Sequence, residues 1–154
     1  MPVLDVLLQL DSAHNYTNTT VVYSQKSFDQ QVATRQIANG EEIGIGVFVT
    51  GLTTSSTDTY NFQVINDSTA ALTSAPIVVA QTGAMTGATD NRINAALAGF
   101  QNGFFLPIPP NSLKFEFIGL GMVGTNTTNI TVDAYLMNAA QWSQYSTQPA
   151  NYTP

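Results

Sequence analysis

Apolar and polar residues alternate in short runs along this chain, and turn-forming residues separate the runs. The alternation is clearest where single polar residues separate Tyr60, Phe62 and Val64. A period of two places these three side chains on one face of a β-strand. On this pattern we predict the strands Thr20–Ser24, Ile43–Thr50, Thr59–Asn66, Ile77–Gln81, Gly103–Ile108, Leu113–Val123 and Thr131–Met137.

Helical periodicity is weak by comparison. Arg92–Phe100 and Ala139–Tyr145 are short segments whose composition permits one or two helical turns. Asn39-Gly40, which lies between apolar runs, predicts a hairpin or another tight turn. Many short strands with long polar connections, and no amphipathic helices between them, predict an all-β fold. We expect a jelly-roll-like or two-sheet antiparallel β-sandwich.

The length of 154 residues fits one domain, because two domains would each have a thin core. We assign residues 1–137 to a single β-sandwich or jelly-roll domain, within which residues 1–19 form a peripheral N-terminal segment. Residues 138–154 form a polar C-terminal tail. Both ends are candidate arms that would contact another protein.

The two ends supply the candidate interface residues. The N-terminal ones belong to a dense apolar run, which is either a contact surface for another protein or a buried edge strand of the same domain. The C-terminal ones are aromatic residues in a polar tail, which is either a frayed terminus or an arm that becomes ordered on a neighbouring subunit. The candidates are Leu4, Val6, Leu7, Leu8, Leu10, Trp142, Tyr145 and Tyr152.

The composition changes the picture because it contains so few charges. Charged residues make up 9% of the chain, against roughly 25% in an ordinary globular domain. Hydrophobic residues make up 44%, which argues against disorder. The polar surface must therefore be built from Thr, Ser, Asn and Gln, and such a surface loses little hydration free energy when a partner covers it. This composition favours a protein that binds other protein surfaces.

The net charge is −6, and the cations are Lys26, Arg35, Arg92 and Lys114. Four scattered cations cannot neutralise a run of phosphates, so we predict no nucleic-acid partner. No Lys/Arg-rich segment suits an anionic membrane, and no apolar stretch approaches the length of a membrane span. The N-terminal run lacks the basic start of a signal peptide, so we expect synthesis in the cytoplasm.

Candidate chemistry is sparse. The absence of cysteine excludes disulfides, thiolate metal sites and cysteine nucleophiles. Gly119, Gly121 and Gly124 match G-x-G-x-x-G, but the match begins inside a predicted strand and no helix follows, so a dinucleotide site is not expected. His14, the single histidine, is interpreted as a surface or turn residue. We predict no enzymatic activity, no cofactor and no catalytic or metal-binding residues.

The acidic residues do not predict a paired acid–base unit. Glu41 and Glu42 are adjacent, so in a strand their side chains would point to opposite faces. The aspartates are dispersed and lack the spacing of a calcium-binding loop. A calcium ion held by loop carbonyls is left open. The aspartates considered are Asp58, Asp67, Asp90 and Asp133.

Several stretches resemble one family. The opening DVLLQLDSAHNYTNTTVV looks like the start of the small capsid cement, or decoration, proteins of tailed bacteriophages. Three later stretches are similar to that family as well: Phe62–Ala75, the F-x-L-P-I-P-P step at Phe104–Pro110, and the T-V-x-A-Y-L run at Thr131–Leu136. The resemblance covers most of Asp5–Leu136, while the C-terminal tail lies beyond it.

The resemblance implies a jelly-roll-like subunit that forms a homotrimer. It further implies that the trimer sits on the outer surface of a virion, at local threefold positions of an icosahedral shell. Its partners would be the major capsid protein and other copies of itself, and its role would be to stabilise the shell.

Two other functions are kept as alternatives. One is a different virion β-domain, such as a tail-fibre, head-fibre or receptor-binding module, or a small jelly-roll shell protein. The other is a carbohydrate-binding module, for which Tyr16, Tyr23 and Trp142 could supply an aromatic platform. A receptor-binding module should bind host cells or glycans in isolation, whereas a cement protein should bind capsids.

Overall fold

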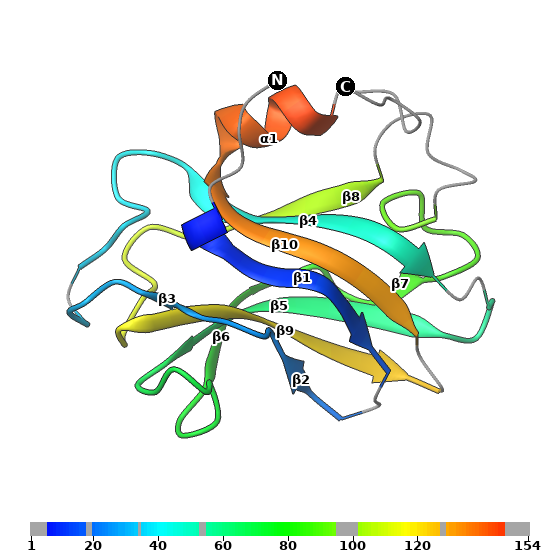
Figure 1. Cartoon of the computed structure of the whole chain (residues 1–154), viewed down its shortest axis with the longest axis horizontal. Helices are drawn as coiled ribbons and strands as arrows, with labels where there is room; N and C mark the ends of the chain where they lie inside the picture. Colours follow the sequence, from blue (N-terminus) through cyan, green and yellow to red (C-terminus); the bar gives the residue numbers. More distant parts are fainter. Residues whose placement is uncertain are drawn as a thin grey trace.

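The computed structural model describes residues 6–17, 20–33, 35–52, 55–94, 102–126 and 129–146. Two antiparallel β-sheets face each other, one above the other in Figure 1, and a short helix lies over the outer face of the upper sheet. The predicted all-β, two-sheet antiparallel sandwich is therefore confirmed. The finer prediction of a jelly roll stays a prediction.

The four-stranded sheet has the strand order β1-β10-β4-β8. A 3₁₀ turn, η1, leads into β1, and helix α1 follows β10 directly. These elements are η1 (Val6–Leu8), β1 (Gln9–Tyr16), β4 (Ile43–Leu52), β8 (Gly103–Pro107), β10 (Ile130–Asn138) and α1 (Ala139–Ser146).

The six-stranded sheet has the order β2-β9-β5-β6, with β3 also paired to β9 and β7 also paired to β5. Its elements are β2 (Val22–Tyr23), β3 (Phe28–Asp29), β5 (Thr59–Asp67), β6 (Ile77–Gln81), β7 (Met85–Thr86) and β9 (Phe117–Thr125). β5 and β9 pair along their whole length, from Thr59 opposite Thr125 to Asp67 opposite Phe117.

An apolar layer between the two sheets forms the core. Tyr16 of β1 meets Phe62 of β5 edge-on, with ring centroids 5.5 Å apart, and Phe62 meets Phe104 of β8 at 5.2 Å. Tyr60, Phe62 and Val64 are all fully buried, as their alternation predicts. Burial of each such side chain contributes about 1.5–3 kcal/mol, so this layer is the main source of stability.

Strand prediction succeeds where the apolar pattern is strong. β6 has the predicted bounds, and β4, β5, β8 and β10 differ from prediction by one or two residues at an end. β1, β3 and β7 were not predicted. β1 is instead the edge strand beside β10 and belongs to the sandwich, although the sequence assigned it to the peripheral segment 1–19. Its pattern is hidden because the register shifts twice and Ala13 has a positive φ of 46°.

The predicted strand Leu113–Val123 starts too early, because the side chain of Asn66 holds its first residues in another conformation. The Asn66 Oδ1 accepts hydrogen bonds from the backbone N–H groups of Lys114 (2.7 Å) and Phe115 (2.8 Å). Its Nδ2 donates to the carbonyl oxygens of Phe115 (2.9 Å) and Phe117 (2.8 Å). Asn66 is fully buried, so this amide replaces the strand pairing that these backbone groups would otherwise need.

Two local predictions have mixed outcomes. Asn39-Gly40 lies in a turn in which Gly40 has a φ of 97°, but the turn is not a hairpin, since β3 pairs with β9 and β4 pairs with β10 and β8. The helical candidate Arg92–Phe100 lies mostly outside the described residues; Arg92 and Ile93 are in a turn.

The C-terminal helix begins with a reciprocal cap. The backbone N–H of Gln141 donates to the Asn138 Oδ1 (2.8 Å), and the backbone N–H of Asn138 donates to the Gln141 Oε1 (3.2 Å). The helical candidate Ala139–Tyr145 is thus confirmed by α1. Because α1 contacts β4, β8 and β10, the first half of the segment assigned to a polar tail is part of the folded body.

Replacement of Asn66 by alanine tests whether the hydrogen bonds of this side chain hold the residues that precede β9. Asn66→Ala leaves four backbone groups without their partner, so we expect the free energy of unfolding to fall by at least about 3 kcal/mol in urea titrations. Asn61→Ala is the control, because Asn61 is half-buried on the outer face, and it should cost less than about 1 kcal/mol. Equal losses in the two variants would contradict this role of Asn66.

Candidate functional site

An apolar hollow opens at one end of the sandwich, beside the start of β1. Its volume is about 290 Å³, and its apolar lining comes from Leu8, Phe28, Ile37, Ile43 and Leu136. A second hollow of about 440 Å³ adjoins it at Glu41, which lines both, and is formed largely by Ala38 and the segment Pro107–Pro110. We call the first hollow together with Leu7 the end patch.

Leu7 is the most exposed apolar side chain of the end patch. It lies in η1 next to Leu8 and is 87% exposed. An apolar side chain held in the open on a short helical turn is available for contact with another surface, and covering it would contribute about 2 kcal/mol.

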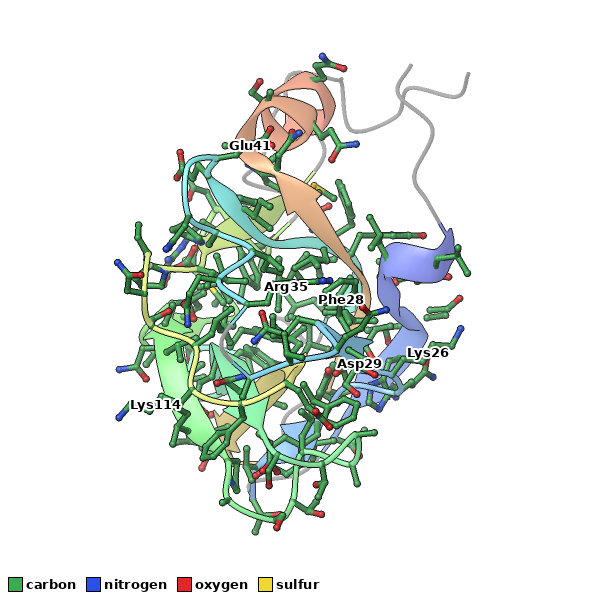
Figure 2. All side chains as sticks on the ribbon, turned by 90° about the vertical axis from the view of Figure 1, so that its left-hand side faces the viewer. Lys26, Phe28, Asp29, Arg35, Glu41 and Lys114 are labelled. Atoms are coloured by element: carbon green, nitrogen blue, oxygen red, sulfur yellow. The ribbon has the colours of Figure 1, made fainter. Side chains whose placement is uncertain are left out.

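Charged side chains lie at this end of the molecule, and Glu41 lines the hollow itself. Figure 2 looks onto this end of the molecule and shows Glu41 at its top, with Lys26, Arg35 and Lys114 lower down. The ion pairs found among the described residues, His14–Asp11 and Arg92–Asp90, do not involve these three cations. The end of the sandwich therefore combines an apolar centre with a rim of both charge signs.

The predicted interface residues of the N-terminal run separate into different environments. Leu10 is 2% exposed and belongs to the core, as expected for an edge strand of the same domain. Leu8 is half-buried against the core, and Leu7 points outward. The backbone of Val6 begins η1, while its side chain and the whole of Leu4 lie outside the described residues.

The aromatic candidates of the C-terminal segment also separate. Trp142 lies on the outer face of the four-stranded sheet, with its ring 5.3 Å from that of Phe48 and stacked at 6.2 Å on that of Phe105. A Cβ atom at Gly46 would lie 2.6 Å from the Met137 Sδ and 3.1 Å from the Trp142 ring, so the glycine leaves room for both side chains. The Tyr145 side chain and all of Tyr152 lie outside the described residues.

These positions bear on the carbohydrate-binding alternative. An aromatic platform for a sugar must be exposed, but Tyr16 is fully buried and Trp142 is packed against Phe48 and Phe105. Tyr23 is half-buried on the other sheet. The three aromatic residues considered for that function are therefore not combined into one exposed surface.

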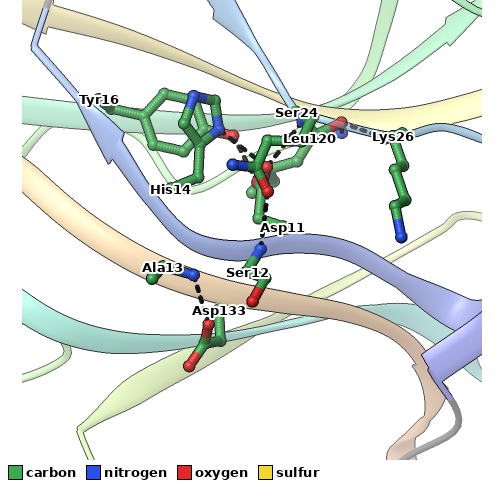
Figure 3. A network of polar contacts seen from close by, with 10 residues as sticks. Asp11, Ser12, Ala13, His14, Tyr16, Ser24, Lys26, Leu120 and Asp133 are labelled. Atoms are coloured by element: carbon green, nitrogen blue, oxygen red, sulfur yellow. Dashed lines mark hydrogen bonds and ion pairs between the residues drawn. The ribbon is translucent and has the colours of Figure 1, made fainter.

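A buried carboxylate organises the polar contacts of β1. Figure 3 shows Asp11 at the centre of this network. Asp11 accepts hydrogen bonds from the His14 Nδ1 (2.8 Å), the Tyr16 hydroxyl (2.6 Å) and the backbone N–H of Gln25 (2.8 Å). Burial raises the pKa of Tyr16 well above its ordinary value, and the charge and hydrogen bond of Asp11 raise it further. Tyr16 thus remains a neutral donor.

The network joins β1 to the segment that precedes β3. The backbone N–H of Ser12 donates to the Gln25 Oε1 (3.0 Å), and that of Lys26 donates to the carbonyl of Leu10 (2.9 Å). His14 is half-buried within β1, which differs from its interpretation as a surface or turn residue. No hydrogen bond joins the Ser12 hydroxyl to His14 among the described contacts, and the arrangement stabilises an edge strand.

The G-x-G-x-x-G match lies entirely within β9, which continues to Thr125. No strand-to-helix turn follows, so the backbone lacks the geometry that binds a pyrophosphate. At Gly121 a Cβ atom would lie 2.9 Å from the Ile65 side chain, and the Tyr23 ring lies close by at 3.6 Å. The glycine permits close approach of neighbouring strands' side chains.

The acidic residues lie apart, each with its own local partners. The Asp67 carboxylate accepts backbone hydrogen bonds from Ser68, Ser74 and Ala75, and so closes the loop between β5 and β6. Asp90 pairs with Arg92 at 2.6 Å. Across the described ranges, no three histidine, aspartate or glutamate side chains come together in a way that could hold a metal ion.

Comparison with known proteins gives no relative: neither a scan against protein-family models nor a search of curated proteins finds a match. In the part of the chain that the structure describes, the helices are too short and too polar to cross a lipid bilayer.

Sequence reasoning identified Leu7 and Leu8 but missed Phe28, Ile37 and Ile43 as parts of the same patch. These residues come from β3, from the turn before β4 and from the start of β4. Nothing in their local pattern indicates that they meet. Only the pairing of β3 with β9, which brings Phe28 to this end, places them together.

The packing of Trp142 can be tested by substitution, with unfolding followed by circular dichroism because Trp142→Ala removes the single tryptophan. Trp142→Ala removes the ring from between Phe48 and Phe105, and we expect a loss of about 2–3 kcal/mol in the free energy of unfolding. The exposed Gln144→Ala should change it by less than about 0.5 kcal/mol. If Trp142→Ala were as stable as wild type, α1 would not contribute to the stability of the folded domain.

The loop closed by Asp67 predicts a pH dependence. Burial raises the pKa of Asp67, but the hydrogen bonds from Ala75, Ser74 and Ser68 outweigh it, so the pKa lies below its ordinary value. The stabilisation is therefore complete at neutral pH and is lost as the pH falls through the folded-state pKa. Asp67→Asn presents a donor to these N–H groups and should unfold more easily than wild type at neutral pH.

Thermal unfolding measured from neutral pH to about pH 2.5 checks this prediction. The difference in stability between wild type and Asp67→Asn should shrink below about pH 4. Glu42→Gln removes an exposed charge and should stay within about 0.5 kcal/mol of wild type at neutral pH. A gap that is constant across the range would show that ionised Asp67 does not stabilise the loop.

Proposed function

We propose that the chain is a virion structural protein, a cement or decoration subunit that binds the outer surface of the major capsid protein lattice through its end patch. It acts as a homotrimer and stabilises the shell by adhesion. The observation that carries the proposal is the 87% exposed Leu7 beside an apolar hollow of about 290 Å³.

The composition of this end supports a protein partner. Protein interfaces have an apolar centre from which charges are depleted, surrounded by a polar rim. Leu8 and Phe28 line the hollow together with Glu41, Leu7 lies next to Leu8 in η1, and Lys26 lies at the same end of the molecule. Rim charges of both signs suit a surface that must select one orientation on a large lattice.

The remaining surface suits the same role. Strands β2, β5, β6 and β9 expose amide, hydroxyl and aliphatic groups, which can be covered at a small desolvation cost. A decoration subunit needs contact area and many copies more than it needs a deep site. Three end patches on one trimer convert modest individual contacts into high avidity.

The resemblance of the sequence to capsid cement proteins supports the same assignment. It concerns four stretches in separate elements: η1 and β1, the second half of β5 with the loop that follows it, β8 with the segment that follows it, and most of β10. The end patch includes Leu8, in the turn that leads into β1, and Leu136 of β10. The adjoining hollow includes Pro107–Pro110. Three of the four resembling stretches therefore contribute residues to the two hollows at this end, and Phe62–Ala75 does not.

Co-sedimentation with capsids tests the proposal. Purified protein is mixed with capsids assembled from the major capsid protein of the same virus, and the bound fraction is measured in the pellet. Wild type should bind saturably, and Leu7→Glu should weaken binding at least about tenfold, because a charge would replace a buried apolar contact at each of three sites.

Thr50→Glu provides the matched control, because Thr50 is exposed on the outer face of β4, away from the end patch. It should bind capsids as wild type does. If wild type binds neither unexpanded nor expanded capsids, the proposed function is refuted. If wild type and Leu7→Glu bind capsids equally well, the end patch is not the contact surface.

A further inference from the structure

The outer face of the six-stranded sheet carries an uncharged row of side chains that crosses four strands. Tyr23 of β2 lies opposite Gly121 of β9, Gly121 lies opposite Gln63 of β5, and Gln63 lies opposite Gln81 of β6. With neighbouring strands about 4.8 Å apart, this row spans roughly 14 Å. We call it, with the adjacent pair Asn61 and Val123, the neutral face.

The neutral face is distinguished by its lack of charge. Among the residues of β2, β5, β6 and β9, Asp67 is the one residue that is charged at neutral pH, and its side chain is buried in the loop contact described above. The exposed charges labelled in Figure 2 gather at the end of the sandwich instead.

Side chains of the neutral face are already arranged by contacts with one another. The Asn61 Nδ2 and the Gln63 Nε2 both donate to the Gln81 Oε1, at 3.2 and 3.3 Å. These long bonds leave amide groups on the surface that can exchange partners. Val78, which is 50% exposed, adds an apolar contact on the neighbouring part of β6.

We infer that the neutral face is the surface through which copies of this chain associate. A chain with a net charge of −6 repels its own copies, so the contact between copies forms where no exposed charge opposes it. A cationic partner would instead be matched by an anionic face of this chain. The row of tyrosine, glycine and amides has the charge-depleted composition of an interface centre.

The geometry fits a trimer. The neutral face is a lateral face of the sandwich, whereas the end patch lies at the end of the strands. Three copies that turn their neutral faces toward a common axis, with their strands running along it, would present three end patches in the same direction along that axis. This inference rests on the proposed function, in that it names the surface by which the copies of the decoration subunit meet.

Gln63→Glu tests the inference, because it places a carboxylate at the centre of the neutral face in every copy. The full-length protein is examined without capsids, by light scattering and sedimentation equilibrium at about 50 µM. Wild type should be an oligomer, and Gln63→Glu should raise its dissociation constant at least about tenfold through like-charge repulsion. The control Thr50→Glu adds the same charge to the other sheet and should remain associated as wild type does.

Salt gives a second readout. Association through an uncharged face opposes the net repulsion between copies, so about 1 M salt should strengthen it, or leave it unchanged. Dissociation by salt would indicate ionic contacts and would overturn the inference. A strictly monomeric wild type, or an oligomer that Thr50→Glu disrupts and Gln63→Glu does not, would overturn it as well.

These measurements contain no capsid, so they are separate from the test of the proposed function. If wild type binds capsids but Gln63→Glu leaves the oligomer unaffected, only the role of the neutral face in association is refuted. An oligomer disrupted by Gln63→Glu, without capsid binding, would refute the decoration role and retain the neutral face.

Discussion

The apolar layer between the two sheets is the contact on which the rest of the molecule depends. The chain has no cysteine and few charges, so neither disulfides nor ion-pair networks can hold the sheets together. Packing of Tyr16, Phe62 and Phe104 fixes the spacing between the sheets. The end patch exists because this layer ends there, with Leu8 and Phe28 half-buried at its margin.

Hydrogen bonds from backbone N–H groups and uncharged side chains satisfy most of the buried polar groups. Asn66 satisfies four backbone groups, and the carboxylates of Asp11 and Asp67 accept mainly from backbone N–H and neutral side-chain donors. This arrangement satisfies the buried polar groups with few cations, and the outer faces of β2, β5, β6 and β9 carry no charge. The same property that shapes the interior thus makes the surface easy to cover, which links the composition to an adhesive function.

The sequence predicts the strands with regular alternation and fails where single side chains override it. Fold class, most strands and α1 follow from periodicity and turn residues. β1 was not predicted as a strand because Asp11 is buried in it and its register shifts twice. The late start of β9 depends on Asn66, which is distant in sequence. The end patch and the neutral face depend on strand order and register, which a single sequence does not specify.

The central claim is that this protein acts as an adhesive between larger pieces, with one surface for the shell and another for its own copies. Cryo-electron microscopy of capsids incubated with the protein tests it most directly. The account predicts density for this chain on the outer surface, with Leu7 facing the shell and Gln63 facing a neighbouring copy. Particles in which Leu7 faces solvent, or from which the chain is absent, would contradict it.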